Sequence, residues 1–144
     1  MSARTHPHAA ARRCALDILF QADVRGEHPM DALQEWLTDG REVPEFAREL
    51  VEGVGSELEE LDLIVGANAH EWTVPRMAAV DRSILRLATY ELLHRPDVPA
   101  GAAIDEAVRA AQELSTEDSG RFVNGVLGAV ARSLPLAEEE DAER

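Results

Sequence analysis

Apolar residues recur at helical spacing along almost the whole chain, and this pattern constrains the fold more than any other feature of the sequence. They return every three or four positions, and no segment shows the apolar–polar alternation that is typical of a half-buried strand. Prolines and glycines divide the pattern: Gly26, Gly40 and Pro96 follow helical pieces, whereas Pro29 and Pro44 open others. We expect about seven pieces joined by short loops, at 9–24, 29–37, 45–70, 72–77, 81–95, 103–114 and 117–134. The fold class that follows is an all-α bundle.

The length of the chain, 144 residues, suits a single domain with a hydrophobic core. We expect this helical domain to span residues 1–136. Within it, a modest shift of composition near Trp72 suggests a three-helix sub-bundle over about 8–70 and a four-helix sub-bundle over about 71–134. Residues 137–144 are rich in acidic side chains, and we expect them to form a flexible acidic tail.

Three features of the composition limit where the protein works and what it binds. No apolar run reaches the roughly 18 residues of a membrane-spanning helix, and the N-terminus lacks the apolar core of a signal peptide. Cys14 is the only cysteine, which excludes an intramolecular disulfide and indicates a cytoplasmic protein. The net charge of −14 argues against a protein that coats nucleic acid through its overall charge.

No arrangement of residues in the sequence indicates catalysis. The five histidines are scattered, and Gly53-Val54-Gly55 lacks the third glycine and the preceding strand of a dinucleotide-binding motif. His6-Pro7-His8 has no cysteine or acidic residue at metal-ligand spacing. We therefore expect a protein that is not an enzyme and that has no metal site and no cofactor.

The first feature that indicates binding is the basic N-terminal segment. Residues 1–16 contain Arg4, Arg12 and Arg13 and no acidic residue, and Phe20 follows two turns later. Arginines can neutralise phosphates, and an aromatic ring on the same helix can stack on a base. The alternative is a frayed, positively charged terminus beside a phenylalanine of the core. The residues alone favour this alternative slightly, because two adjacent arginines are a weak signal.

The second feature is the segment 115–127, a capped helix start that leads into an unusual helix. Asp118 is expected in the first turn, where the helix dipole favours a carboxylate. Phe122 continues the apolar stripe, but Asn124 and Gly125 interrupt it, and glycine costs about 1 kcal/mol in a helix interior. Taken singly, helix capping by Asp118, core packing of Phe122 and an interhelical hydrogen bond from Asn124 are each favoured over binding.

Four stretches of the chain resemble the NusB family of bacterial transcription antitermination factors. They read RRCALDILFQAD at 12–23, DRSILR at 81–86, IDEAV at 104–108 and FVNGVL at 122–127. The resemblance extends over nearly the whole length, and the order and spacing of the stretches hold from residue 81 to residue 127.

The resemblance implies an all-α fold of two packed helical subdomains and a function in transcription. In this family the protein binds boxA, a short single-stranded RNA element of ribosomal RNA leader transcripts, together with ribosomal protein S-ten (also called NusE). The assembly joins the transcription elongation complex and helps RNA polymerase to read through terminators. The alternative function is a helical protein-interaction module with little RNA binding of its own.

The resemblance also assigns roles to individual positions. The RNA-binding residues that it implies are Arg4, His8, Arg12, Arg13, Phe20, Asp118, Phe122 and Asn124, and the partner-binding residues are Asp81 and Arg82. Two features depart from the family, because His8-Ala9-Ala10-Ala11 stands where many relatives have several arginines and Phe20 lacks the hydroxyl of a tyrosine. These departures imply greater dependence on the protein partner, or a homodimer of the free chain. Asn124 and Gly125 are also expected to let the last helix pack closely on its neighbours.

Overall fold

Seven α-helices and one short 3₁₀ turn form residues 8–134, the part of the chain that the computed structural model describes. The helices are α1 (Ala9–Arg25), α2 (Pro29–Thr38), α3 (Glu45–Ser56), α4 (Leu58–Asn68), α5 (Ala79–His94), α6 (Ala100–Leu114) and α7 (Glu117–Ser133), and the 3₁₀ turn η2 (Val74–Arg76) precedes α5. None of the described residues lies in a strand, so the expected all-α fold is confirmed. None of these helices is long and apolar enough to cross a membrane. Arg4 and the expected tail, 137–144, lie outside the described residues.

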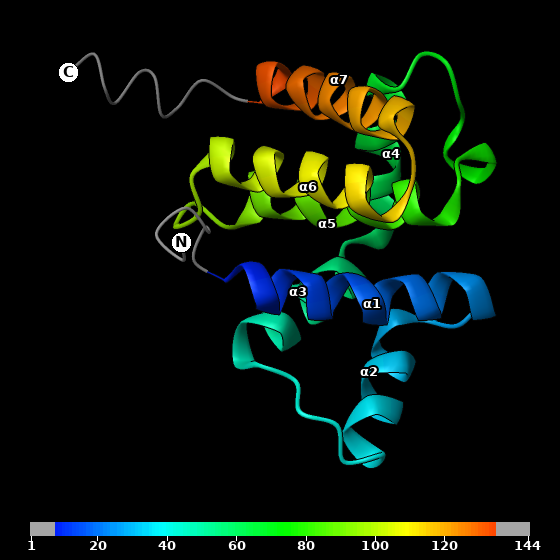
Figure 1. Ribbon diagram of the computed structural model, residues 1–144, viewed down its shortest axis with the longest axis vertical. Coiled ribbons are helices and arrows are strands. Elements are labelled where there is room, and N and C mark those ends of the chain that lie inside the picture. The colour runs from blue at the N-terminus through cyan, green and yellow to red at the C-terminus, as the bar shows by residue number, and fades with distance from the viewer. Residues whose placement is uncertain (1–7, 135–144) are drawn as a thin grey trace.

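The helix α1 lies between two groups of helices (Figure 1). On one side it packs against α2 and α3, and on the other against α5, which packs in turn against α6 and α7. The helix α4 packs mainly on α5 and α7 and touches α3 little. These contacts favour a division into α1–α3 and α4–α7, whereas the composition suggested a boundary near Trp72. The buried hydrophobic side chains of both groups belong to one continuous core.

The local sequence explains the ends of several helices. α1 ends at Gly26, whose φ of 69° is a left-handed conformation that glycine adopts without strain. α2 has Pro29 at its first position, where the missing N–H costs no helical hydrogen bond. At the start of α7 the Thr116 hydroxyl oxygen accepts a hydrogen bond from the backbone N–H of Ser119 at 3.0 Å, which is an N-cap. The predicted bounds of these helices are therefore close to the observed ones.

The region predicted as one helical piece, 45–70, is two helices in the structure. The break is at Glu57, whose backbone angles (φ −113°, ψ 19°) are not helical. Gly53 precedes the break but does not cause it. A Cβ at this position would overlap the ring of Tyr90. Glycine here lets α3 approach α5 closely. The short piece predicted at 72–77 corresponds to η2.

Ion pairs join α5 to α1 and α4. Arg82 and Arg86 of α5 both pair with Asp23 of α1, at 2.7 and 3.3 Å, and Arg86 also pairs with Asp62 of α4 at 2.7 Å. Burial works against the charged form of Arg86, but the two carboxylates outweigh it and raise the pKa of its guanidinium. Arg12, nearer the start of α1, pairs with Glu91 of α5. We call this ion pair and those of Arg82 and Arg86 the α1–α5 seam.

Candidate nucleic-acid interface

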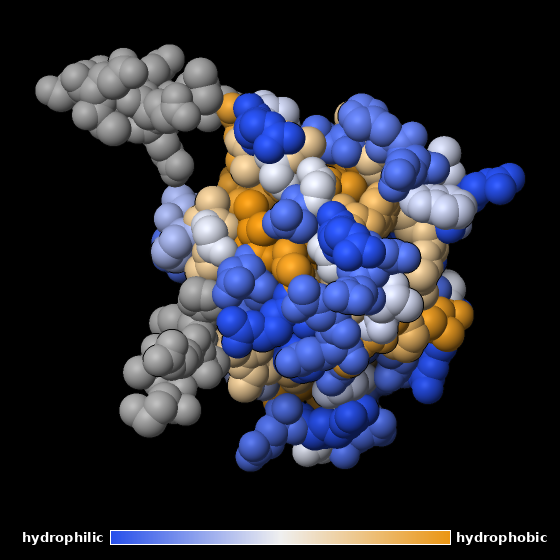
Figure 2. Space-filling view, turned by 45° about the horizontal axis from the view of Figure 1, so that its top comes forward, coloured by the Kyte–Doolittle hydropathy of each residue, from blue (hydrophilic) through white to orange (hydrophobic). Residues whose placement is uncertain are grey.

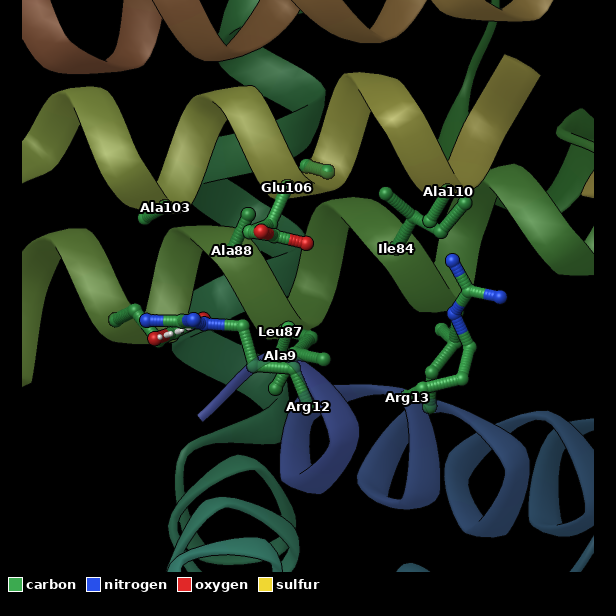
Figure 3. Close-up of a pocket in the computed structure, with 12 residues that line it drawn as sticks. Ala9, Arg12, Arg13, Ile84, Leu87, Ala88, Ala103, Glu106 and Ala110 are labelled. Carbon is green, nitrogen blue, oxygen red and sulfur yellow. Dashed lines mark hydrogen bonds and ion pairs between the residues drawn. The ribbon is translucent and has the colours of Figure 1, made fainter. Parts of the chain in front are cut away.

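Arg12 and Arg13 are neighbours on α1, but their side chains diverge (Figure 3). Arg12 runs toward α5, where its Nε donates to the two carboxylate oxygens of Glu91 at 3.0 and 2.9 Å. The two side chains are only 8% and 1% exposed, and the Arg12 guanidinium lies 5.7 Å from the ring centroid of Phe46 in α3. Arg12 therefore belongs to the α1–α5 seam and has little surface to offer to a phosphate.

Arg13 reaches the molecular surface beside α6. Its Nη2 pairs with Glu113 at 2.6 Å, and 38% of its side chain is exposed. An exposed ion pair contributes only about 0–1 kcal/mol, so a phosphate can compete with Glu113 for this arginine. The cavity that Arg12 and Arg13 border, between α1, α5 and α6, measures about 30 Å³ and has room for a water molecule but not for an organic ligand.

Phe20 is 38% exposed and borders a shallow hollow of about 210 Å³. The hollow is completed by Leu16 and Asp17 of α1, Val80 of α5 and Leu114 of α6, and Leu114 is also exposed. The alternative interpretation of Phe20 as a residue of the core is therefore wrong. An exposed ring beside a second apolar side chain is a suitable platform for stacking.

A second hollow, of about 340 Å³, also lies at the start of α5, where Asp81 borders it and the preceding residue, Val80, borders the first hollow. Side chains that line it come from the loop before α5, from α5 and from α7, and include Trp72, Arg76, Asp81, Asp118, Ser119 and Phe122. The structure thus places Phe20 and the start of α7 at two hollows that both border the start of α5. We call Arg13, Phe20, Asp81, Asp118 and Phe122 the binding surface.

Asp81 is buried but only partly hydrogen-bonded. Its Oδ2 accepts a hydrogen bond from the Ser119 hydroxyl at 3.1 Å, whereas its buried Oδ1 has no partner among residues 8–134. Burial raises the pKa of Asp81, and the bond from Ser119 opposes this shift only in part. Because Oδ1 is buried, a donor on a bound partner would reach it only after the side chain moves.

The predicted partner-binding residue Arg82 is engaged by the protein itself. Besides its pair with Asp23, its Nη1 donates to the backbone carbonyl oxygens of Val74 and Met77 at 3.0 and 2.9 Å. Arg82 therefore holds the η2 segment against α5. It shapes one wall of the second hollow without lining it.

The four unusual residues of α7 have different environments. Asp118 is exposed and pairs with Arg121 on the same helix, and Phe122 is half-buried with one side toward the second hollow. Asn124 and Gly125 are exposed, and nothing lies within 4 Å of the place that a Gly125 Cβ would take. The expectation that these two residues serve helix packing is therefore wrong. Asn124 does not line either hollow.

His8 lies far from Phe20, at the other end of α1. The twelve residue steps from His8 to Phe20 correspond to about 18 Å along the helix axis. The imidazole of His8 stacks on the ring of Phe46, with centroids 3.9 Å apart and an angle of 17° between the planes. The structure does not bring His8 to the binding surface, and Arg4 lies outside the described residues.

Sequence reasoning missed Trp72, which lines the second hollow with a side chain that is 52% exposed. Periodicity could not have found it, because it lies in the irregular loop between α4 and η2. The available signal was a large aromatic residue between polar neighbours, Glu71 and Thr73. An exposed tryptophan of this kind is more typical of interfaces than of a free surface.

These features define a small all-helical protein whose candidate site is an open surface rather than an enclosed pocket. The face in Figure 2 is mostly hydrophilic, with apolar patches between hydrophilic side chains. Open, mixed surfaces with exposed rings suit extended macromolecular ligands better than small molecules, which bind in enclosed, mainly apolar pockets.

The chain belongs to the NusB family, whose sequence model matches residues 9–132. A transcription antitermination protein NusB from Symbiobacterium thermophilum is 45% identical over 142 residues, which cover 91% of this chain and 93% of the relative. Another, from Acidothermus cellulolyticus, is 49% identical over 131 residues, which cover 90% and 88%. The family predicted from the sequence is therefore confirmed.

Solved structures agree with this assignment. NusB from T. maritima superposes with a TM-score of 0.81 at 35% identity, covering 96% of this chain and 99% of that one. A chain in a crystal structure of antitermination factors NusB and NusE with double-stranded RNA superposes with a TM-score of 0.77 at 28% identity, covering 88% and 97%. The helical architecture is thus shared with these proteins.

Proposed function

We propose that this protein binds boxA single-stranded RNA of ribosomal RNA leader transcripts together with ribosomal protein S-ten, and so supports read-through by RNA polymerase in the transcription elongation complex. Relatives named as transcription antitermination proteins, and one relative seen with NusE and RNA, support this proposal. The role is one of binding and not of catalysis, and its place is the cytoplasm, where bacterial transcription occurs.

The observation that carries the proposal is the meeting of two distant segments at the start of α5. Phe20 of α1 borders one hollow and Phe122 of α7 the other, and consecutive residues of α5, Val80 and Asp81, border the first and the second. Accessible rings together with an exposed arginine suit single-stranded RNA recognition, because unpaired bases stack on rings while cations hold the backbone.

Each member of the binding surface has a chemically distinct role in this proposal. Arg13 exchanges Glu113 for a phosphate, and Phe20 and Phe122 stack on unpaired bases. Asp118 accepts hydrogen bonds from base edges once a base displaces Arg121. Arg12 contributes indirectly, by fixing α1 against α5.

The protein partner binds on the Asp81 side of the same surface. Asp81 and the exposed ring of Trp72 line the same hollow. A basic partner would also offset the net charge of −14 and supply phosphate contacts of its own. Because Asp118 and Phe122 border this hollow too, RNA and partner would meet there, and each would raise the affinity for the other.

An electrophoretic mobility shift with boxA RNA and a scrambled RNA of equal length tests the proposal, with and without S-ten. We expect a shift of boxA RNA that S-ten strengthens, and a much weaker shift of the scrambled RNA. Equal affinity for the two RNAs at every S-ten concentration would favour the alternative, a helical protein-interaction module. Sedimentation of the free chain over a range of concentrations tests separately whether it is a monomer or a homodimer.

A further inference from the structure

Glu57, Glu60 and His94 place three metal-binding groups side by side, outside the binding surface. Glu57 lies at the break between α3 and α4, Glu60 in the first turn of α4, and His94 at the last position of α5. One ligand atom from each residue lies within 4.8 Å of the other two. Within residues 8–134 this is the one group of three histidine, cysteine or acidic side chains with such spacing.

We propose that Glu57, Glu60 and His94 bind a Zn²⁺ ion, with water in the fourth position. Tetrahedral zinc with ligand bonds of about 2.0–2.2 Å needs ligand atoms about 3.3 Å apart. His94 Nε2 and Glu60 Oε1 are already 3.2 Å apart, so one edge of the tetrahedron exists. The Glu57 ligand atom lies within 4.8 Å of the other two, so its carboxylate needs to move by no more than about 1.5 Å, which its side-chain torsions allow.

The donor set favours a transition metal such as zinc over Mg²⁺ and Ca²⁺. A neutral imidazole nitrogen with two carboxylates suits zinc, whereas Mg²⁺ and Ca²⁺ prefer oxygen ligands only. The imidazole is also held in place, because its ring centroid lies 5.2 Å from that of Tyr90 one turn earlier on α5. A ligand with limited freedom loses little entropy when the metal binds.

Uncompensated charge around the cluster favours a cation. Other carboxylates near the end of α5 have a cationic partner, because Glu49 and Asp97 share Arg95, at 2.7 and 2.9 Å. Glu57 and Glu60 have no arginine partner in the described part of the chain. A divalent ion would replace the weak His94–Glu60 contact with bonds to all three groups and reduce the repulsion between the two glutamates.

The position of the cluster gives the metal a structural consequence. It would tie the α3–α4 break to the end of α5, and so connect the two groups of helices. A ligand that binds only the folded state stabilises it by mass action. At a free zinc concentration about a hundred times the Kd, the melting temperature of a chain of this size should rise by about 6–10 °C.

Calorimetric titration of the full-length protein with Zn²⁺, and separately with Mg²⁺, tests the site. We expect one zinc ion per chain and no comparable binding of Mg²⁺. His94→Gln and Glu60→Gln should each weaken zinc binding by more than about 100-fold, because even the loss of outer-shell contacts costs about 10–100-fold. The matched control is His70→Gln, which removes another exposed histidine outside the cluster, and His6→Ala/His8→Ala tests the N-terminal pair.

The melting temperature with and without zinc provides a second measurement. His94 and Glu60 are exposed, so their metal-free variants should melt close to the wild type. Only the zinc-dependent rise should disappear, and the absorption spectrum of bound Co²⁺ should report four-coordinate geometry in the wild type and in His70→Gln. The site is refuted if His94→Gln and His70→Gln bind zinc equally well, or if His6→Ala/His8→Ala abolishes the binding.

Discussion

The α1–α5 seam and the binding surface both contain arginines paired with carboxylates, but in the seam these pairs hold helices together and at the binding surface they can be exchanged for a ligand. Arg12 and Arg13 show the difference most directly. One α-helical step turns a side chain by about 100°, and this rotation sends Arg12 to the buried Glu91 and Arg13 to the exposed Glu113. Burial makes the first pair hard to break, whereas solvent makes the second pair exchangeable. An arginine close to a binding surface is therefore available to RNA only if its present partner is weakly held.

The largest expected difference between Arg12 and Arg13 is in the free energy of unfolding that is lost when each is replaced by alanine. Arg12→Ala leaves Glu91 buried without its cation, which typically costs about 3–5 kcal/mol. Burial already raises the pKa of Glu91, and Arg12 is the main group that opposes this shift. Arg13→Ala should cost less than about 1 kcal/mol. Urea unfolding monitored by circular dichroism measures both, and similar losses in the two variants would contradict the distinction.

Replacement of both charges in the seam sharpens this test. Arg12→Met/Glu91→Leu keeps the volume and leaves no unpaired charge, so it should recover most of the stability lost in Arg12→Ala. Such a variant also separates folding from RNA binding, because it retains the complete binding surface.

Removal of an exposed ring should weaken RNA binding with little effect on the fold. Phe20→Ala should cost about 1–3 kcal/mol of affinity for boxA RNA, which is the usual value of one stacked base. Phe20→Tyr, with its ring intact, should bind at least as well as the wild type. Fluorescence anisotropy of a labelled RNA in the presence of S-ten gives the affinities. Unchanged affinity of Phe20→Ala would place the RNA elsewhere.

Gly53, packed against α5, and Gly125, exposed on α7, allow the same comparison between a packed and an exposed position. Gly125→Ala should stabilise the protein by about 1 kcal/mol, because alanine favours a helix and nothing lies near the added Cβ. Gly53→Ala should destabilise it, because the Cβ would overlap Tyr90. Differential scanning calorimetry of the two variants should show shifts of opposite sign. If Gly125→Ala also weakens RNA or S-ten binding, the exposed face of α7 belongs to the interface.

Much of the fold could be predicted from the sequence, because the signals that set it are local. Proline and glycine mark the ends of α1 and α2, and helical spacing marks their buried faces. The break at Glu57 was missed, because this glutamate is itself a good helix former and the apolar pattern continues through it.

The site was less predictable, because its decisive contacts are distant in sequence. The role of Arg12 depends on Glu91, 79 positions away. The zinc cluster joins Glu60 to His94 across 34 positions, so the sequence indicated no metal site. The rule that polar residues and glycines in a helix serve packing also failed at Asn124, since periodicity identifies a face but not what covers it.

Salt dependence distinguishes the two arginines by a smaller effect. Arg13→Ala should reduce the slope of log affinity against log salt by up to about 0.7, the value for one phosphate contact with a single strand. Arg12→Met/Glu91→Leu should keep the wild-type slope, because Arg12 makes no phosphate contact in the proposed complex. A titration between low and physiological salt measures both. A flattened slope only in the seam variant would reverse the assignment.

Asp81 belongs to the binding surface and precedes Arg82 of the seam. Its buried carboxylate should lower the free energy of unfolding of the free protein, and binding of a partner should restore it. Because burial raises the folded-state pKa of Asp81 above the unfolded value of about 3.9, the folded state binds the proton more tightly. Stability is thus lost as pH rises from about 4 through the folded-state pKa, and the loss persists at pH 7. Asp81→Asn can still accept the Ser119 hydrogen bond and cannot ionise. It should therefore be slightly more stable than the wild type at pH 7 and no more stable below pH 4, although it binds S-ten more weakly.

Urea midpoints at the two pH values, with calorimetry against S-ten, measure both effects. Lower stability of Asp81→Asn at pH 7 would mean that the carboxylate is held by the fold itself and is not kept for a partner.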